Sequence, residues 1–372
     1  MMILCKPTWR NQITNIDPYI PGKSIEDVKK EYHLERVLRL ASNENPRGAS
    51  PKAMKAARQS IEDVQYYPET TAKKLRGELA HFYHVSSDEI ITANGADNIL
   101  TLLISAYVNE GDEVIYCTPT FPAYRSTTLL MGGVPIEVDL TADWCFDLDA
   151  IYEQITPKTK MIFICNPNNP TGTIVSSEQL LAFLDKVPDH VQVVLDEAYI
   201  EYVEDNDYMN GIDLFKKSYP IITVRTFSKY YGLAGLRVGY AVASKEKLEP
   251  VLCIREPFST NRTAIHAAIA ALNDQAFAKS HLLENKKEKV YLCKELKALG
   301  YEVIESHTNF LFVYLNMDSV SLFKGLLPHG IIIRPATPWG YPNHARITIG
   351  TREQNQLLVK LLSSIRAETS TY

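Results

Sequence analysis

Four polar clusters in the middle of the chain carry side chains that could do chemistry together. They occupy residues 94–97, 166–172, 196–199 and 228–229, with 27 positions from Asn169 to Asp196 and 33 from Asp196 to Lys229. A lysine amine in a partly desolvated pocket can form a Schiff base with an aldehyde, and a carboxylate can keep a ring nitrogen protonated. The joint order of the clusters therefore favours covalent catalysis by an amine together with an electron-sink cofactor.

Pyridoxal phosphate is the cofactor that makes these demands on a protein, because it carries an aldehyde, a ring nitrogen and a phosphate. Asp196 would partner the ring nitrogen, and Asn169 and Tyr199 could hydrogen-bond the ring oxygen. Donors for the phosphate are the first amides of a helix that begins after Gly95 and Ala96, the Ser228 hydroxyl and the Arg237 guanidinium. Lys229 is then predicted to be the lysine that attaches the cofactor.

Each cluster taken alone also fits a purely structural role. The Asn-Pro-Asn-Asn-Pro-Thr-Gly run at 166–172 has the residues of a turn, and Asn94-Gly95 is an ordinary turn dipeptide. Asp196 could be a helix cap, and a single lysine such as Lys229 is usually solvated. The functional interpretation depends on all four occurring together.

The elements that position these clusters are short apolar runs, rich in Val and Ile, that read as strands buried on both faces. Helical patterns lie between several of them, at 98–108 and 178–184, which predicts an α/β fold with a large, mainly parallel sheet. In such a sheet the carboxyl ends of the strands line one crevice, where ligands bind. The predicted strands are residues 89–93, 112–117, 160–165, 191–195, 221–225 and 238–242.

The pattern changes after about residue 255, which divides the chain into predicted domains. A long helical stretch reaches Ala298, and short strands at 302–304, 310–314, 330–333 and 346–349 precede a last helix near 353–365. This order is typical of a smaller α+β domain. We expect an N-terminal arm with a short helix at 1–40, a large cofactor domain at 41–255 and a small domain at 256–372.

Composition limits the partners and the compartment. Lysine and arginine number 39 against 44 acidic residues in 372, a net charge of −5, so no basic field attracts nucleic acid or an anionic membrane. No segment has the apolar length of a signal peptide or a membrane span. The six cysteines form no CxxC pair, which favours thiols in a reducing cytoplasm over disulfides or a metal site.

On these residues the sequence resembles the fold-type I pyridoxal-phosphate aminotransferases, and within that family it is similar to the histidinol-phosphate aminotransferases. The resemblance extends over nearly the whole chain. It is carried by residues 17–22, 40–46, 66–68, 95–97, 119–124, 168–172, 196–199, 225–229, 232–237, 330–335 and 346–351.

The resemblance implies a transaminase of histidine biosynthesis, which exchanges an amino group between a small amino donor and a 2-oxo acid. It also implies a homodimer with shared sites. Catalytic roles would belong to Lys229, as Schiff-base lysine and proton shuttle, Asp196 and Tyr199. Other cofactor contacts would be Gly95, Ala96, Asp97, Ser228 and Arg237 at the phosphate, Asn169 at the ring oxygen, Phe121 stacked on the ring and Tyr67 from the other subunit. Substrate contacts would be Tyr19, Asn43, Arg334 and Arg346.

Three positions depart from the commoner family pattern, and other functions stay open. Phe121 stands where tyrosine is frequent, Arg47 where an aromatic or aliphatic residue is usual, and Asn98 where glutamate is frequent.

An aromatic amino acid aminotransferase would make similar demands on the pocket, and a decarboxylase or cyclase could use Lys229 and Asp196 as well. A ligand sensor on the same scaffold is disfavoured because no DNA-binding extension is expected beyond residues 1 and 372.

Overall fold

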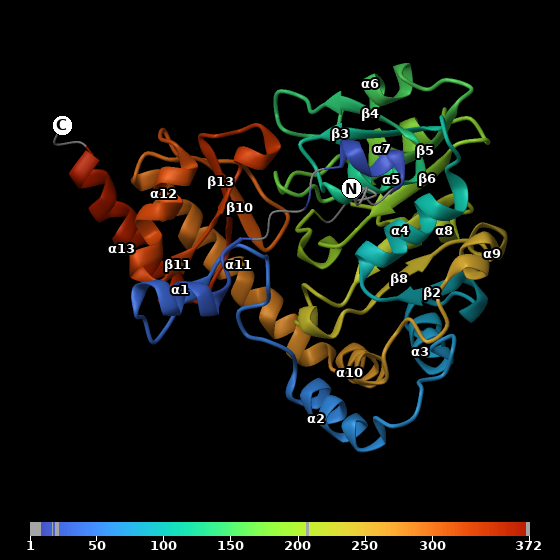
Figure 1. The fold of residues 1–372 in the computed structure, drawn as a ribbon, viewed down its shortest axis with the longest axis horizontal. Coiled ribbons are helices and arrows are strands. Elements are labelled where there is room, and N and C mark those ends of the chain that lie inside the picture. Colours follow the sequence, from blue (N-terminus) through green and yellow to red (C-terminus); the bar gives the residue numbers. More distant parts are fainter. Residues whose placement is uncertain (1–8, 17, 19–21, 206–207, 370–372) are drawn as a thin grey trace, which may run out of the picture.

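The computed structural model describes residues 9–16, 18, 22–205 and 208–369. Two bodies share the chain, each built around its own sheet (Figure 1). Within the described residues, no helix is long and apolar enough to cross a membrane. Nor does any group of three or more His, Cys, Asp or Glu side chains in that part of the chain have the arrangement of a metal site.

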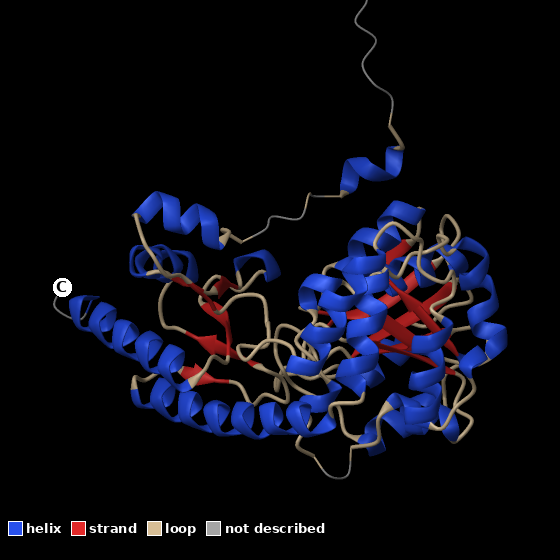
Figure 2. Cartoon of the chain, turned by 90° about the horizontal axis from the view of Figure 1, so that it is seen from below, coloured by secondary structure: helices blue, strands red, loops and turns tan. Residues whose placement is uncertain are grey.

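The larger body contains a seven-stranded sheet in the order β2-β8-β7-β6-β5-β3-β4, in which β8 alone runs antiparallel to its neighbours. Helices cover both of its faces (Figure 2), which is why its central strands are apolar runs without alternation. The six strands predicted for this sheet are confirmed, and β4 at the edge adds a seventh. The strands are β2 Ile90–Ala93, β3 Glu113–Thr118, β4 Val134–Asp139, β5 Thr159–Cys165, β6 Gln192–Asp196, β7 Ile221–Thr226 and β8 Gly239–Val242.

Local sequence explains where the covering helices begin. Ser176 and Gln179 form a capping box at the start of α7, and Asn210 caps α8 with its side chain. Gly95 precedes α4 with a φ of 86°, a backbone conformation that suits glycine. The helices are α3 Lys73–Tyr83, α4 Ala96–Tyr107, α5 Ala123–Met131, α6 Leu148–Glu153, α7 Ser177–Leu184, α8 Gly211–Lys216 and α9 Lys245–Ile254.

The smaller body has a four-stranded antiparallel sheet in the order β12-β13-β10-β9. The first part of the chain joins it, because β1 (Leu38–Arg39) pairs in parallel with β11 (Ile331–Ile332) and Val28 of α1 packs against Leu327 and Ile332. Its elements are α1 Ile25–Tyr32, α11 Gln275–Ala298, β9 Glu302–Val303, β10 Phe310–Tyr314, α12 Ser319–Leu326, β12 Arg334–Pro335, β13 His344–Thr348 and α13 Arg352–Thr369.

Two helices, α2 (Pro51–Ser60) and α10 (Arg262–Leu272), lie side by side below the larger body, and the long α11 runs from there to the smaller one (Figure 1). Ala264 and Ala268 of α10 pack in one apolar cluster with Leu75 of α3 and Val238. This packing groups α10 with residues before the predicted boundary at 255. The division into three domains stays a prediction.

Candidate active site

The four polar clusters follow β2, β5, β6 and β7, which all point the same way, so their carboxyl ends meet at one edge of the sheet. Backbone hydrogen bonds extend the strand pairing into the clusters. The Asn166 amide donates to the Asp196 carbonyl at 3.0 Å, and the Glu197 amide to the Val224 carbonyl at 2.8 Å. The crevice expected from the sequence therefore has its walls at this edge.

Lys229 is partly buried just beyond β7. Its amine donates a hydrogen bond of 3.1 Å to the Ser42 carbonyl and lies 5.7 Å from the centre of the Tyr199 ring. Burial, assisted by the charge of Arg346, lowers the pKa of the Lys229 amine to about 8. A substantial fraction of this amine is therefore neutral, and so nucleophilic, near physiological pH.

Asp196 ends β6 and is only 4% exposed. Its carboxylate accepts a hydrogen bond of 2.7 Å from the Tyr124 hydroxyl and one of 3.2 Å from the Ala198 amide. Burial raises the pKa of Asp196 to about 6 although these two donors oppose the shift. No lysine, arginine or histidine in the described residues forms an ion pair with it. A buried carboxylate in this state would be stabilised by a cation that enters the crevice.

Tyr199 and Asn43 meet from the two sides of the crevice. The Asn43 side-chain amide donates to the Tyr199 hydroxyl at 2.9 Å, and the Asn43 backbone amide donates to the Thr348 hydroxyl at 2.9 Å. Burial raises the pKa of Tyr199 to about 12, so its hydroxyl keeps its proton. Thr348 belongs to β13, so this chain of bonds joins the larger body to the smaller one.

Two arginines of the smaller body lie side by side on its sheet, and one of them contacts Asn169. Arg334 and Arg346 are direct partners in the antiparallel pairing of β12 with β13. The Arg346 guanidinium donates to the Asn169 side-chain oxygen and, at 2.7 Å, to the Ala41 carbonyl. Arg346 is only 8% exposed, and Arg334 is partly buried. Two forked cations on one face of a short ladder are an arrangement that suits an anionic ligand.

A separate cradle forms where α4 begins. Arg237 pairs with Asp97 at 3.0 Å, and its guanidinium lies 3.5 Å from the Ser228 hydroxyl. A Cβ on Gly95 would lie 2.6 Å from the Arg237 guanidinium, and the φ of 86° at this position also favours glycine. Ala96 and Asp97 supply the first amides of the helix. Helix amides, a hydroxyl and a guanidinium together are the donor set of a phosphate site.

Comparison with known proteins places this arrangement in a family. The family described as aminotransferase class I and II matches residues 35–362. The chain belongs to the class I and II aminotransferases. It is 41% identical over 357 residues to a histidinol-phosphate aminotransferase of Caldicellulosiruptor saccharolyticus, covering 96% of this chain and 99% of that one. It is also 41% identical to that of Bacillus subtilis over 356 residues, with the same shares covered.

Solved structures agree on the fold of this aminotransferase. The histidinol-phosphate aminotransferase of Sinorhizobium meliloti, solved in complex with pyridoxal 5′-phosphate, superposes with a TM-score of 0.87 at 26% identity, covering 96% of this chain and 98% of that one. An aspartate aminotransferase of Thermus thermophilus, solved with maleate, gives a TM-score of 0.81 at 23% identity over 96% of this chain and 98% of that one. The predicted fold-type I architecture is confirmed.

The other predicted site residues of the aminotransferase have different surroundings. Phe121 meets the buried Tyr124 edge-on, with ring centres 5.9 Å apart. Tyr67 is 79% exposed and stacks on Phe258 at 4.6 Å, so its ring contact is outside the crevice. Tyr19 lies outside the described residues.

Two of the unusual positions have contacts that explain them. The Arg47 guanidinium donates to the Ser280 hydroxyl at 3.0 Å and lies 5.2 Å from the Phe277 ring centre, which fastens the 42–47 loop to α11. The Asn98 side-chain oxygen accepts from the Asn94 amide at 3.3 Å. Both residues therefore hold loops that border the crevice.

Sequence reasoning missed three residues that touch this site. Tyr124 binds Asp196, the Ser42 carbonyl binds the Lys229 amine, and Trp339 stacks against both arginines. Tyr124 and Ser42 fall inside motifs that carried the family resemblance, so motif membership was the available signal. Trp339 falls between two such motifs, and only its contacts identify it.

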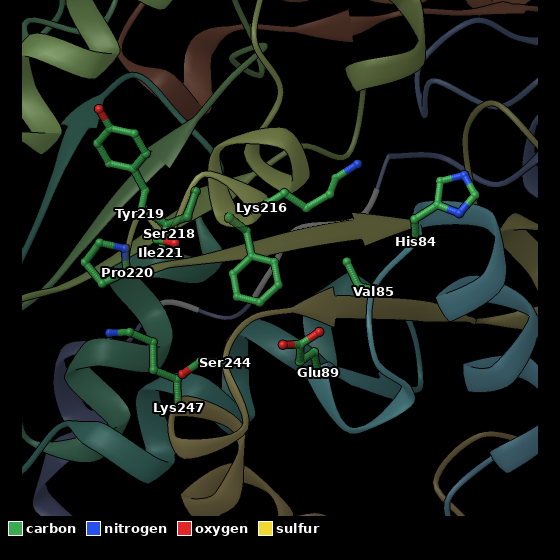
Figure 3. Close-up of a pocket in the computed structure, with 11 residues that line it drawn as sticks. His84, Val85, Glu89, Lys216, Ser218, Tyr219, Pro220, Ile221, Ser244 and Lys247 are labelled. Atoms are coloured by element: carbon green, nitrogen blue, oxygen red, sulfur yellow. The ribbon is translucent and has the colours of Figure 1, made fainter.

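A cavity of about 470 Å³ lies elsewhere, near the start of β7 and beyond the end of β8 (Figure 3). Val85 and Phe215 line it together with charged side chains such as Glu89 and Lys247. Ile221 opens β7 in this cavity, whereas Lys229 follows the opposite end of that strand. The cavity is therefore at the edge of the sheet away from the crevice.

Proposed function

We propose that this aminotransferase transfers an amino group from histidinol phosphate to 2-oxoglutarate, giving imidazole-acetol phosphate and glutamate in histidine biosynthesis. Relatives that carry this activity in their names are about 41% identical over nearly the full chain. The observation that carries the proposal is the pair Arg334 and Arg346, which are direct partners on one ladder, with Arg346 bonded to Asn169. The amino donor and the acceptor both present anionic groups that such a pair can bind.

The residues of the crevice fit pyridoxal phosphate, which is the cofactor. When bound, pyridoxal phosphate supplies an electron sink for negative charge that develops at the substrate carbon. Asp196 is buried and forms no ion pair within the described part of the chain, so it could hold the ring nitrogen in its protonated form. Asn169 and Tyr199 would hydrogen-bond the ring oxygen, and Phe121 would cover a face of the ring.

The cradle at the start of α4 fits the cofactor phosphate. The amides of Ala96 and Asp97, the Ser228 hydroxyl and the Arg237 guanidinium are its donors, and Gly95 leaves room for the guanidinium. Asp97 is paired with Arg237, so its carboxylate orients that side chain, while its backbone amide faces the anion.

Lys229 is the group that attaches the cofactor and afterwards moves a proton at the reacting carbon. A pKa of about 8 suits both tasks, because the neutral amine can accept a proton and the ammonium can return it near neutral pH. The Ser42 carbonyl, 3.1 Å away, orients the amine. The amine is partly buried, which limits the access of water to this proton transfer.

The substrate residues lie on the other wall. Arg346 would bind the carboxylate of glutamate and the matching group of the second substrate, and Arg334 would add a second forked contact. Asn43 stands near this position through its bond with Tyr199, and Tyr19 would close over the site from the N-terminal arm.

We also propose that the enzyme is a cytoplasmic homodimer in which Tyr67 reaches the cofactor phosphate of the other subunit. Apolar side chains around Tyr67 support this, because Val64 is 72%, Tyr66 63% and Phe258 38% exposed in the single chain. The free thiols of Cys117, Cys145, Cys165, Cys253 and Cys293 suit a reducing compartment.

The experiment that tests the substrate compares wild-type kcat/KM for histidinol phosphate, phenylalanine and tyrosine, repeated in Arg334→Met. A phosphate monoester is close to a dianion at pH 7, so Arg334 should contribute more to it than to an aromatic amino acid. We expect Arg334→Met to lower kcat/KM for histidinol phosphate by about 10–100-fold and that for phenylalanine by less. A wild type that prefers an aromatic amino acid, or a variant that loses both activities equally, would overturn the substrate and leave an aminotransferase.

A further inference from the structure

Trp339 stands between the two substrate arginines and the larger body. Its ring centre is 6.0 Å from the Arg334 guanidinium carbon and 5.4 Å from that of Arg346. Its indole N–H donates a hydrogen bond of 3.0 Å to the Thr120 carbonyl, next to Phe121 in the chain. One side chain thus touches both proposed anion-binding groups and a loop of the other wall.

The two arginines need such a support. They are direct cross-strand partners, and like charges at opposite positions of an antiparallel ladder repel each other. The faces of a tryptophan ring carry negative potential, and a guanidinium near such a face is attracted to it. The indole therefore offsets part of the repulsion and limits the positions that each guanidinium can take before an anion binds.

The contacts of Trp339 form a closed series that crosses the crevice and returns to Trp339. The Thr120 hydroxyl donates to the Asn168 side-chain oxygen at 2.8 Å, and the next residue, Asn169, accepts a hydrogen bond from Arg346. Arg346 then stacks against Trp339. This closed ring of contacts fixes the distance between the arginine ladder of the smaller body and the loops of the larger one.

We infer that Trp339 is a positioning residue, which holds Arg334 and Arg346 ready for an anionic substrate group and couples them to the loop that carries Phe121. The inference rests on the proposed transaminase function and adds to it the residue that preorganises the anion contacts. The η7 turn of Thr337–Trp339, closed by Gly340 with a φ of 85°, presents the indole from the smaller body.

The test uses the holoenzyme and glutarate, a dicarboxylate with the carbon chain of glutamate and no reacting group. Binding is followed by the change in cofactor absorbance in wild type, Trp339→Leu and Trp339→Phe. Loss of the ring should weaken glutarate binding by about 3–30-fold in Trp339→Leu. The phenylalanine variant keeps a smaller aromatic face and loses the N–H and the second ring, so it should recover part of the affinity.

Two further variants separate positioning from general packing. Trp144 also packs between the bodies, with ring centres 5.4 Å from Phe312 and 5.0 Å from Tyr341, and its ring contacts include neither arginine. Trp144→Leu should lower the thermal midpoint and change the glutarate affinity by less than about twofold. In an Arg334→Met background the Trp339→Leu effect should shrink, because part of what the ring holds is already gone.

The same variants are assayed with glutamate and with histidinol phosphate, where KM should rise by a larger factor than kcat falls. Equal losses in Trp339→Leu and Trp339→Phe, a Trp144→Leu effect of the same size, or full additivity with Arg334→Met would overturn the inference. A wild type that binds glutarate and transaminates glutamate but leaves histidinol phosphate untouched would overturn the proposed substrate alone. The glutarate series would still decide the role of Trp339.

Discussion

The carboxyl ends of β6 and β7 carry two pairs of oppositely charged residues, and only one of these pairs forms an ion pair. On the core side, Arg225 and Glu197 form a buried ion pair at 2.7 Å, and Arg225 also donates to Asn210 at 2.8 Å. On the crevice side, the donors that Asp196 has among the described residues are neutral, and the Lys229 amine donates to a backbone carbonyl. Neighbouring positions at the ends of β6 and β7 thus carry two kinds of pair. Arg225 and Glu197 are a closed pair, because their charges contact each other. Asp196 and Lys229 are an open pair, because the described residues show no ion pair between them.

The difference lies in what is left for a ligand. Glu197 is 1% exposed and has a guanidinium and the Gly211 amide as donors, so its charge is compensated inside the protein. Burial raises the pKa of Asp196 to about 6 and lowers the pKa of Lys229 to about 8, so both side chains change their charge close to neutral pH. A cofactor could bring a ring nitrogen to Asp196 and an aldehyde to Lys229. Leaving these two groups uncompensated lowers the stability of the protein but keeps them reactive.

The largest expected effect is on the crevice side. Asp196→Ala should lower the rate of transamination by about a thousandfold or more, because the ring nitrogen loses the partner that keeps it protonated. The measurement is the half-reaction with glutamate, made on variant protein whose cofactor absorbance shows that it retains the cofactor. Near-normal turnover would show that Asp196 is only a strand-end cap.

The matching change on the core side should affect stability instead. Glu197→Gln removes the carboxylate that pairs with the buried Arg225, so the free energy of unfolding in urea should fall by about 3–5 kcal/mol. Turnover of the folded fraction should stay within about tenfold of wild type. Replacing both partners with methionine should restore part of the stability, and a loss below about 1 kcal/mol in the single variant would contradict a closed pair.

The open carboxylate should also reveal itself through pH in the cofactor-free protein. Burial raises the pKa of Asp196 from its usual 3.8 to about 6, so the native state holds this proton more tightly than the unfolded state does. Its favourable contribution is present at low pH and is lost as pH rises through 6. Between pH 5 and 7.5, the unfolding free energy of wild type should fall relative to Asp196→Asn by about 1–2 kcal/mol. Parallel pH profiles would refute the raised pKa.

The smallest effect concerns the amine. If Lys229 attaches the cofactor through its neutral amine, the rate of cofactor uptake should rise about tenfold from pH 7 to pH 9 and then level off. Peptide mapping after borohydride reduction should find the cofactor on Lys229. A rate that keeps rising past pH 10, as for an ordinary solvated lysine, would contradict the lowered pKa.

Much of the architecture of the crevice could be predicted from the sequence. Buried strands leave continuous apolar runs, turns and helix starts leave Gly, Pro, Asn and Ser, and parallel strands bring their carboxyl ends to one edge. These local signals were sufficient to predict the strands before Asp196 and Lys229, the helix after Gly95 and a shared crevice. The pairing partner of each charge left no such signal, since Asp196 and Glu197 are adjacent carboxylates of the same strand end.

The contacts that join distant parts of the chain were decided only by the tertiary structure. Asn43 meets Tyr199 across 156 positions, Trp339 meets Thr120 across 219, and α10 packs beside α2. Arg334 faces Arg346 because of the register of two short strands, which burial of their apolar neighbours sets rather than the arginines themselves. The sequence by itself determined which polar residues follow the strand ends, because strands and turns leave local signals in the sequence. The ladder of Arg334 and Arg346 and its contacts with Trp339 arose from long-range packing, which no local pattern records.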